Sequence, residues 1–529
     1  MQALHINGND LTFEELREVV YARRPVLLDA EARERVERAR AVVDDLVVNN
    51  RVAYAITTGV GMLSDVHINP EQNRELQVNL LRSHAAGVGE PLSEAETRAM
   101  LLLRANSLAK GFSGVRPEVI NTLCEMLNRG VHPVVPSQGS VGASGDLAPL
   151  AHLALVLIGE GEAFVSDTPR SPGKPERRGK KLSGAKALTA AQIKPLTLEA
   201  KEAISLINGT QAMLAVGTLA LLSAETLAAS ADVIGALTVD ALKGTDAAFD
   251  ERIHSARPHA GQSLVAANLR KMLEGSGIRE SHRDCGKVQD AYSLRCIPQV
   301  HGAVRDTLVF CRRVFETEMN SAVDNPLVFA EEKQVGKPKG IVEEAHGDIV
   351  SGGNFHGEPI AFALDYLAIA LTALAGISER RIERLVNPLL NEGLPPFLAA
   401  GAGLNSGFMM PQVTAAALVS ENKGLAHPAS VDSITTSGNK EDYVSMGMGG
   451  AIKLKRVVAN TRMVLAIEAT AVAQALDFLA PLKTSKLGQQ AHAAIRSVTE
   501  TVSQDRVLAG DFAKVAELIE SGKISQVLS

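Results

Sequence analysis

The chain has 529 residues with a formal net charge of −6 at pH 7, and 46% of its residues are hydrophobic. It lacks the basic excess of a nucleic-acid-binding protein, and no long Pro-, Gly- or Ser-rich linker divides it. Aromatic residues make up only 3%, with no Trp. The core must therefore be built from Ala, Leu, Val and Ile, a composition that suits close helix packing.

The first residues, 1–12, mix polar and charged side chains and contain no apolar signal core, so no export is expected. The cysteines are too few to staple a chain of this length and lack the paired spacing of metal ligands. They are Cys124, Cys285, Cys296 and Cys311. We expect reduced thiols, a cytoplasmic protein and no metal site.

Helical spacing of apolar residues dominates the chain and predicts a mainly all-α fold. The predicted helices cover Ala32–Val48, Ala95–Lys110, Glu199–Val216, Thr218–Leu237, Ala303–Asn320, Pro359–Leu385 and Lys453–Leu476. Long amphipathic helices need one another to bury their apolar faces, which favours a bundle. The most apolar window, 211–237, is interrupted by Glu225 and Asp232, which favours a buried helix over a membrane span.

Two residues in the N-terminal part of the chain have side chains that could take part in proton transfer. Tyr54 lies in a loop whose Gly59 and Gly61 allow a tight turn, and His84 ends a helical stretch. Taken alone, each is more often structural. The stretch 166–181 is rich in Pro, Arg, Lys and Gly without large apolar residues, and we expect an exposed loop with no binding role.

The tripeptide Ala143-Ser144-Gly145 can build an electrophile from its own backbone. If the Gly145 nitrogen attacks the Ala143 carbonyl and Ser144 then loses its hydroxyl, the product is a 4-methylidene-imidazol-5-one ring. The same residues also suit a helix entrance with Ser144 or Asp146 as N-cap. The two interpretations are compatible, because a helix N-terminus would make such a ring more electrophilic.

Two further segments carry polar residues that have a structural interpretation as well as a functional one. Asn208 precedes an apolar helix and could be simply its N-cap. Arg295 could bind an α-carboxylate bidentately or form a surface ion pair. The Gly-rich segment 351–357 has no lysine of a nucleotide cradle, so phosphate binding is not expected.

The run from Gly139 to Leu150 resembles the Gly-Ser-x-Gly-Ala-Ser-Gly-Asp-Leu-x-Pro-Leu hallmark of the histidine, phenylalanine and tyrosine ammonia-lyase family. Further blocks resembling the family extend from Tyr54 to Gly447 in the family's order. The resemblance implies an elongated helical bundle and a homotetramer whose active sites are shared between subunits. We expect an N-terminal domain over 1–200 with the cofactor segment, a central long-helix bundle over 201–480 and a C-terminal helical segment over 481–529.

The resemblance also implies the cofactor and the roles of the site residues. Ala143, Ser144 and Gly145 would form the methylidene-imidazolone, and Tyr54 would remove the substrate β-proton. That role needs a phenolate, so we expect the pKa of Tyr54 to lie below about 10. By the same resemblance, other residues surround the substrate: Asn208 at its amino end, Arg295 at its carboxylate, and Gln289, Tyr292 and Phe355 beside the ring.

The pair Ser83-His84 is similar to the branch of the family that acts on histidine. Glu441 is able to accept an imidazole N–H. These matches imply elimination of ammonia from L-histidine to give trans-urocanate. Lys440 and Tyr443 depart from the pattern of that branch, and Lys440 could pair with Glu441 or an adjacent acid. A tyrosine or phenylalanine ammonia-lyase, or an aminomutase, therefore stays open. A scaffold protein without the chemistry is the alternative from another class.

Overall fold

The computed structural model describes residues 1–166, 179–330, 341–344 and 347–528. Helices hold 59% of the chain and strands 7%, so the prediction of a mainly helical fold is confirmed. Contacts divide the chain into two compact units. Unit 1 comprises Met1–Leu219, Arg313–Leu364 and Pro428–Ile452, and unit 2 comprises Ala220–Arg312, Asp365–His427 and Lys453–Ser529. The division at 200 and 480 stays a prediction.

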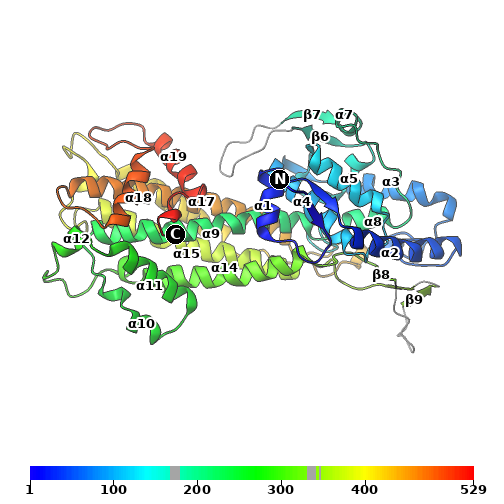
Figure 1. Ribbon diagram of the computed structural model, residues 1–529, viewed down its shortest axis with the longest axis horizontal. Helices are drawn as coiled ribbons and strands as arrows, with labels where there is room; N and C mark the ends of the chain where they lie inside the picture. Colours follow the sequence, from blue (N-terminus) through cyan, green and yellow to red (C-terminus); the bar gives the residue numbers. More distant parts are fainter. Residues whose placement is uncertain (167–178, 331–340, 345–346, 529) are drawn as a thin grey trace. The chain divides into compact units, whose positions relative to one another are not determined.

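Four long helices have residues in both units (Figure 1). They are α9 (Gln211–Ala241), α14 (Ile297–Met319), α15 (Glu358–Val386) and α17 (Gly447–Phe478). Glu468 of α17 ties three of them together inside unit 2, since it accepts hydrogen bonds from Thr238, Ser378 and Arg381. These side chains are fully buried, and a buried charge is tolerated only when paired in this way.

The remaining helices of unit 1 are shorter and surround one another closely. They are α1 (Phe13–Tyr21), α2 (Ala30–Val48), α3 (Asn73–His84), α4 (Glu94–Ala109), α5 (Pro117–Asn128), α6 (Leu147–Leu157), α7 (Gly184–Ala190) and α8 (Glu202–Ile207), with 3-10 turns η1 (Gly61–Leu63), η2 (Pro70–Gln72) and η5 (Ser437–Asn439). Capping boxes at Thr12 and Ser93 start α1 and α4 by satisfying backbone N–H groups that have no partner within the helix.

Small sheets complete unit 1. In one, β1 (Leu4–Ile6) pairs with β2 (Val26–Leu28) in parallel, and in an antiparallel one β3 (Val88–Pro91) pairs with β5 (Pro136–Gln138). In the other two, which are antiparallel, β6 (Glu162–Val165) lies between β4 (Val131–Pro133) and β7 (Lys180–Ser183), and β10 (Gly347–Val350) lies between β8 (Leu327–Phe329) and β9 (Ile341–Glu344). Strand β7 begins at Lys180, within the expected loop 166–181; residues 167–178 of that loop lie outside the described part of the chain.

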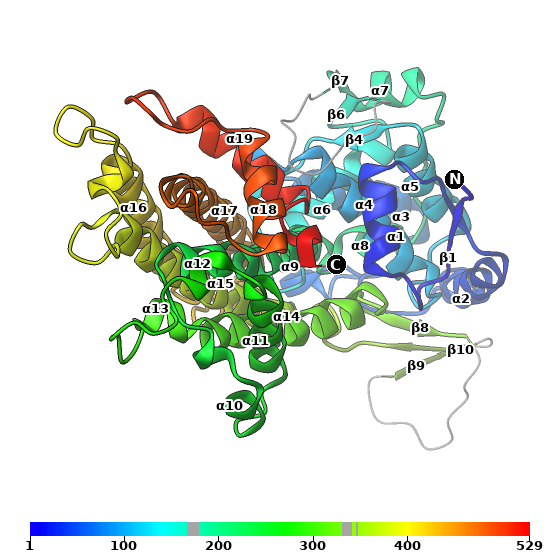
Figure 2. The ribbon, with the colours of Figure 1, turned by 60° about the vertical axis from the view of Figure 1, so that its left-hand side comes forward.

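Unit 2 adds short helices around its portions of the long ones (Figure 2). They are η3 (Ala247–Phe249), α10 (Glu251–Ser255), α11 (Ala260–Leu273), α12 (Gly277–Glu280), α13 (Tyr292–Arg295), η4 (Pro396–Leu398), α16 (Met409–Leu425), α18 (Lys486–Arg496), α19 (Ala509–Glu520) and η6 (Ser525–Leu528). Within this unit, α9 and α14 are joined by a buried contact of 2.9 Å between Asp232 and His301 Nδ1.

The predicted helix break at Gly217 is wrong. Helix α9 runs through Gly217, and the chain breaks instead at 208–210, between α8 and α9. A Cβ at Gly217 would lie 2.6 Å from Leu364 Cδ2 and 3.2 Å from Phe315 Cζ. This glycine therefore permits close helix packing and does not end a helix.

Among the described residues, two helical spans are long and apolar enough to cross a membrane: Glu202–Ala241, which comprises α8 and α9, and Glu358–Val386. In their most apolar windows, 72% and 56% of the residues are buried inside the protein. The first of these contains the window 211–237, and its burial agrees with the prediction of a core helix.

Candidate active site

A cavity of about 920 Å³ lies entirely within unit 1. Segments far apart in the sequence line it, and among its lining residues are most of those that the sequence singled out: Tyr54, His84, Ala143, Ser144, Asn208, Phe355 and Glu441. Folding thus brings the predicted base, the predicted cofactor segment and the predicted imidazole ligands to one cavity.

The turn that carries Ser144 depends on glycine. Gly142 and Gly145 have φ values of +69° and +70°, a conformation that L side chains rarely adopt. A Cβ at Gly145 would lie only 2.3 Å from the carbonyl oxygen of Gly209. The backbone on either side of Ser144 therefore adopts a conformation and a packing that only glycine accommodates without strain.

Asp146 stabilises this turn through hydrogen bonds. Its backbone N–H donates to Gly209 O at 2.7 Å, and its carboxylate accepts from the Ser140 hydroxyl and the Met213 N–H at 2.8 Å each. Asp146 occupies the N-cap position of α6, yet its side chain makes no capping bond there. Complete burial raises the pKa of Asp146 to about 6, against the opposing effect of these hydrogen bonds.

Helix α6 begins at Leu147, directly after the turn. The predicted helix entrance is therefore confirmed, and Ser144 lies just before the N-terminus of the helix. The partial positive charge of a helix N-terminus favours negative charge that develops at this position.

Glu441 contacts Ser144 directly in the cavity. The Ser144 hydroxyl donates to Glu441 Oε1 at 2.6 Å, and the Thr436 hydroxyl donates to Oε2 at 2.7 Å. Partial burial opposes ionisation of Glu441, but hydrogen bonds from Ser144, Thr436 and Ser437 and the nearby His84 outweigh it and lower its pKa. Glu441 is therefore a carboxylate at neutral pH.

His84 lies at the end of α3 with its Nδ1 2.8 Å from Leu80 O. A carbonyl only accepts, so Nδ1 carries the proton. Burial lowers the pKa of His84, against the opposing effects of the Leu80 bond and of Glu441. The neutral ring then presents the lone pair of Nε2 as an acceptor.

Tyr54 is held by its own loop, because Gly61 N donates to Tyr54 Oη at 3.3 Å. This loop contacts the turn that carries Glu441: a Cβ at Gly438 would lie 2.6 Å from Met62 Cγ. The segments that bear Tyr54 and Glu441 therefore support each other.

Asn208 ends α8 and is buried. Its Nδ2 donates to Asn325 O at 3.2 Å. Among the described residues its Oδ1 has no hydrogen-bond partner, although buried polar atoms are nearly always paired. This oxygen is thus able to accept an N–H from a ligand.

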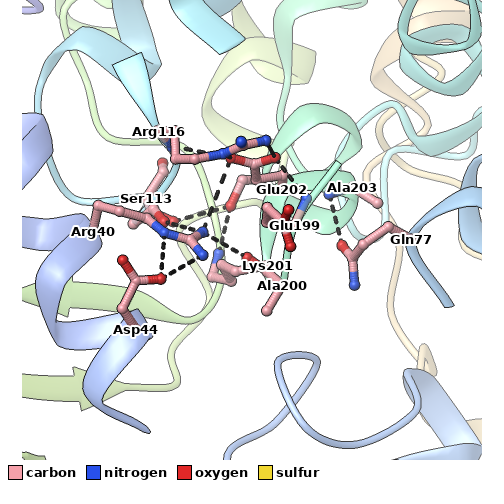
Figure 3. Close-up of polar contacts among 12 residues, drawn as sticks. Arg40, Asp44, Gln77, Ser113, Arg116, Glu199, Ala200, Lys201, Glu202 and Ala203 are labelled. Carbon is pink, nitrogen blue, oxygen red and sulfur yellow. Dashed lines mark hydrogen bonds and ion pairs between the residues drawn. The ribbon is translucent and has the colours of Figure 1, made fainter. Parts of the chain in front are cut away.

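A buried ionic network anchors α8 (Figure 3). Glu202 lies between Arg116, whose Nε donates to it at 2.8 Å, and Arg40, at 3.9 Å. Beside it, Lys201 Nζ pairs with Asp324 at 2.9 Å, and neither side chain is exposed. Lys201 precedes the helix that ends at Asn208, and Asp324 precedes Asn325. This ion pair therefore fixes two residues that line the cavity.

Three predicted site residues do not line this cavity, since Gln289, Tyr292 and Arg295 belong to unit 2. Tyr292 is 72% exposed, and the guanidinium carbon of Arg295 lies 4.7 Å from the centre of its ring. Arg295 Nε has no partner among the described residues. Their roles in catalysis stay predictions.

Sequence reasoning missed Thr436 and Asn325. Thr436 supports Glu441 from five positions earlier, across the turn η5, and Asn325 meets Asn208 from a distant segment. Neither has a spacing that signals its role. The Gly438-Asn439 pair, which permits the turn, is the one local sign that Thr436 and Glu441 lie close together.

Lys440 and Tyr443, which depart from the pattern of the histidine branch, also line the cavity. In the described part of the chain, no ion pair joins Lys440 to Glu441, so the pairing that the sequence suggested is not formed. Tyr443 stacks on His356 with ring centres 6.1 Å apart.

Comparison with known proteins identifies the family. Residues 11–497 match the family described as aromatic amino acid lyase. A curated relative, a histidine ammonia-lyase from Koribacter versatilis (strain Ellin345), is 71% identical over 525 residues, covering 99% of each chain.

Two solved structures are similar over nearly the whole chain. A histidine ammonia-lyase from Trypanosoma cruzi has a TM-score of 0.88 at 42% identity, covering 100% of this chain and 95% of its own. A tyrosine aminomutase from Streptomyces globisporus has a TM-score of 0.90 at 38% identity, covering 99% and 98%. The chain belongs to the aromatic amino acid lyase family.

Proposed function

We propose that the protein eliminates ammonia from L-histidine to give trans-urocanate. The observation that carries the proposal is the pair of acceptors, Glu441 and neutral His84, in the cavity that contains Ser144. An imidazole offers an N–H donor to such acceptors, whereas a phenyl ring offers none and leaves both unpaired at a cost in binding. The 71% identity to a histidine ammonia-lyase supports the same substrate.

The cofactor we propose is the methylidene-imidazolone formed from Ala143, Ser144 and Gly145. The residues present fit it: Ala143 and Gly145 are small, and Gly145 lies where a Cβ would collide with Gly209. When formed, the group supplies an electrophilic carbon that converts the substrate amine into a better leaving group.

The chain's own residues bind and orient the substrate around this position. We assign the unpaired Asn208 Oδ1 to the substrate amino group and Glu441 and His84 to its imidazole. Tyr54 Oη accepts the β-proton, and the Gly61 N–H that donates to Oη orients it.

We also propose a homotetramer in which Arg295, Tyr292 and Gln289 reach the cavity of another subunit. There, Arg295 anchors the α-carboxylate through its guanidinium. In unit 2, Tyr292 is exposed, and Arg295 Nε has no hydrogen-bond partner among the described residues. None of the three residues lines the cavity of unit 1. These observations support the proposal. Light scattering of the purified protein tests the assembly. We further propose a cytoplasmic location, supported only by the cysteine usage and the N-terminal sequence.

A tyrosine ammonia-lyase or aminomutase is the second candidate. Tyr443 and Lys440 in the cavity favour it, as does the similarity to a tyrosine aminomutase. A phenol O–H also satisfies an acceptor such as His84.

Initial rates of ammonia release from L-histidine, L-tyrosine and L-phenylalanine decide between them, with Ser144→Ala as the blank. We expect histidine to be fastest by at least about tenfold, the effect of one unpaired polar contact. A faster rate with tyrosine, or a β-amino acid product, would favour the second candidate. No release from any of the three would contradict the lyase proposal.

A further inference from the structure

Ser144 and Glu441 make a contact that exists only before the cofactor forms. The Ser144 hydroxyl donates to Glu441 Oε1 at 2.6 Å. Formation of the proposed ring removes that hydroxyl as water, so the bond disappears on maturation. Glu441 therefore meets two partners in succession, first the serine hydroxyl and then the substrate.

We propose that Glu441 is a catalytic residue for the dehydration of Ser144 and that Thr436 positions it. The inference rests on the proposed function, because it concerns the ring that this function requires. After the Gly145 nitrogen has closed the ring, the Glu441 carboxylate takes the Cα proton of Ser144. The C–H electron pair becomes the Cα=Cβ bond, the Cβ–Oγ bond breaks, and the same proton returns to Oγ, which leaves as water. The carboxylate is regenerated, and no oxidant or further reactant is needed.

The position of Glu441 suits a proton carrier. The Ser144 Cα lies two covalent bonds from the Oγ that Glu441 already contacts. Closing the ring acidifies the Cα–H, because the carbanion is stabilised by the adjacent carbonyl. General acid–base catalysis requires a group within hydrogen-bond reach of the atoms that exchange the proton.

Other titratable groups near the turn are engaged elsewhere. Asp146 accepts from Ser140 and Met213. His84 Nδ1 donates to Leu80, and Tyr54 Oη accepts from Gly61. Among the residues that the structure describes, Glu441 is the titratable group within hydrogen-bond distance of Ser144 Oγ.

Thr436 keeps the carboxylate in place. Its hydroxyl donates to Oε2 at 2.7 Å, and its backbone N–H donates to Glu441 O at 2.9 Å. Three of the four residues between them, Ser437 to Asn439, have positive φ. This tight turn directs Oε1 toward Ser144 while Oε2 stays bound, and the lowered pKa of Glu441 keeps it ionised and ready to take a proton.

Intact mass spectrometry during cell-free synthesis of the full chain tests the proposal without any activity measurement. Ring closure removes one water, about 18 Da, and dehydration a second, about 36 Da in total. The wild type is expected to reach the second loss. Glu441→Gln is expected to accumulate the first loss and proceed at least about tenfold more slowly, because general acid–base catalysis contributes about 100-fold or more.

The variants distinguish proton transfer by Glu441 from a purely structural role of its side chain. Gln accepts the same serine hydroxyl, so a purely structural role would leave Glu441→Gln processed at the wild-type rate, and that result would overturn the proposal. A stall before the first loss would overturn it as well, since Glu441 is assigned to the second step. Thr436→Val should slow the second loss and Thr436→Ser should restore it, which keeps the test valid should Glu441→Gln fail to fold.

Different outcomes contradict the proposed function and this inference. A wild-type chain that releases ammonia while keeping its unmodified mass would contradict the cofactor itself. A Glu441→Gln chain that is fully processed but inactive on L-histidine would restrict Glu441 to substrate binding and leave the lyase proposal intact.

Discussion

Asp146 shows at the scale of one residue how the site uses a buried charge. Its carboxylate bonds to Ser140 and Met213 on both sides of the turn that carries Ser144, and it has no exposed surface. The ionised form therefore lacks solvation by water, and the hydrogen bonds compensate only in part. A neutral side chain of the same shape would hold the turn without this penalty.

This penalty predicts a pH dependence of stability. The pKa of folded Asp146 is raised to about 6 from 3.8, so its stabilising contribution is fully present below the unfolded value and is lost as pH rises through about 6. Relative to Asp146→Asn, the wild type should gain about 1 kcal/mol in free energy of unfolding between pH 7 and pH 5. Urea titrations of both proteins at the two pH values measure it, and a difference that does not change with pH would contradict the assignment.

At the scale of the element, α8 is a short helix whose position depends on buried ion pairs rather than on length. Lys201 and Asp324 are both fully buried. Removal of one partner leaves the other charge unpaired in a medium of low dielectric constant.

We expect Lys201→Met to lower the free energy of unfolding by about 3–5 kcal/mol. The double variant Lys201→Met/Asp324→Asn should recover at least half of that loss, because it leaves no unpaired charge. Urea unfolding of the three proteins measures both effects. If the free energy of unfolding of Lys201→Met lies within about 1 kcal/mol of the wild-type value, water must reach the ion pair.

The long helices supply a second prediction at this scale. Gly217→Ala introduces a Cβ 2.6 Å from Leu364 and should destabilise the protein by about 1–3 kcal/mol, as overpacking does. Gly376 lies inside α15, where an added Cβ would have no other atom within 4 Å, so Gly376→Ala should be neutral or stabilising by up to about 1 kcal/mol. Thermal unfolding compares the two, and equal effects would show that Gly217 does not mark a close contact.

At the scale of the whole molecule, the site residues fall into two groups. Tyr54 and Ser144 belong to unit 1, and Arg295 belongs to unit 2. If the proposed tetramer shares its sites, a complete site takes the first group from one subunit and the second from another.

Complementation between inactive variants tests this sharing. Co-expressed Tyr54→Phe and Arg295→Met chains should regain about a quarter of wild-type ammonia release, because random mixing restores that share of sites. Co-expressed Tyr54→Phe and Ser144→Ala chains are the control and should regain none through shared sites of this kind, since both residues line one cavity of one chain. Mixed oligomers without recovery in the first pair would contradict shared sites.

The sequence by itself determined the helical class, most of the long helices and seven of the residues that line the cavity, Tyr54, His84, Ala143, Ser144, Asn208, Phe355 and Glu441. Periodic apolar positions report helices directly, and the run 139–150 is too long and specific a motif to be ambiguous. The break between α8 and α9 was misassigned because a glycine ends a helix or lets two helices approach, and only the neighbour Leu364 distinguishes the cases.

Only the tertiary structure decided which atoms face one another. Thr436 and Asn325 gain their importance from hydrogen bonds across turns and between distant segments, and the ion pair of Lys201 with Asp324 spans 123 positions. Burial also sets the ionisation of His84, Asp146 and Glu441, since each pKa depends on the solvent excluded and the donors supplied by other segments. Local sequence specifies which chemical groups are present, but their distances and ionisation states arise from the packing of the whole unit.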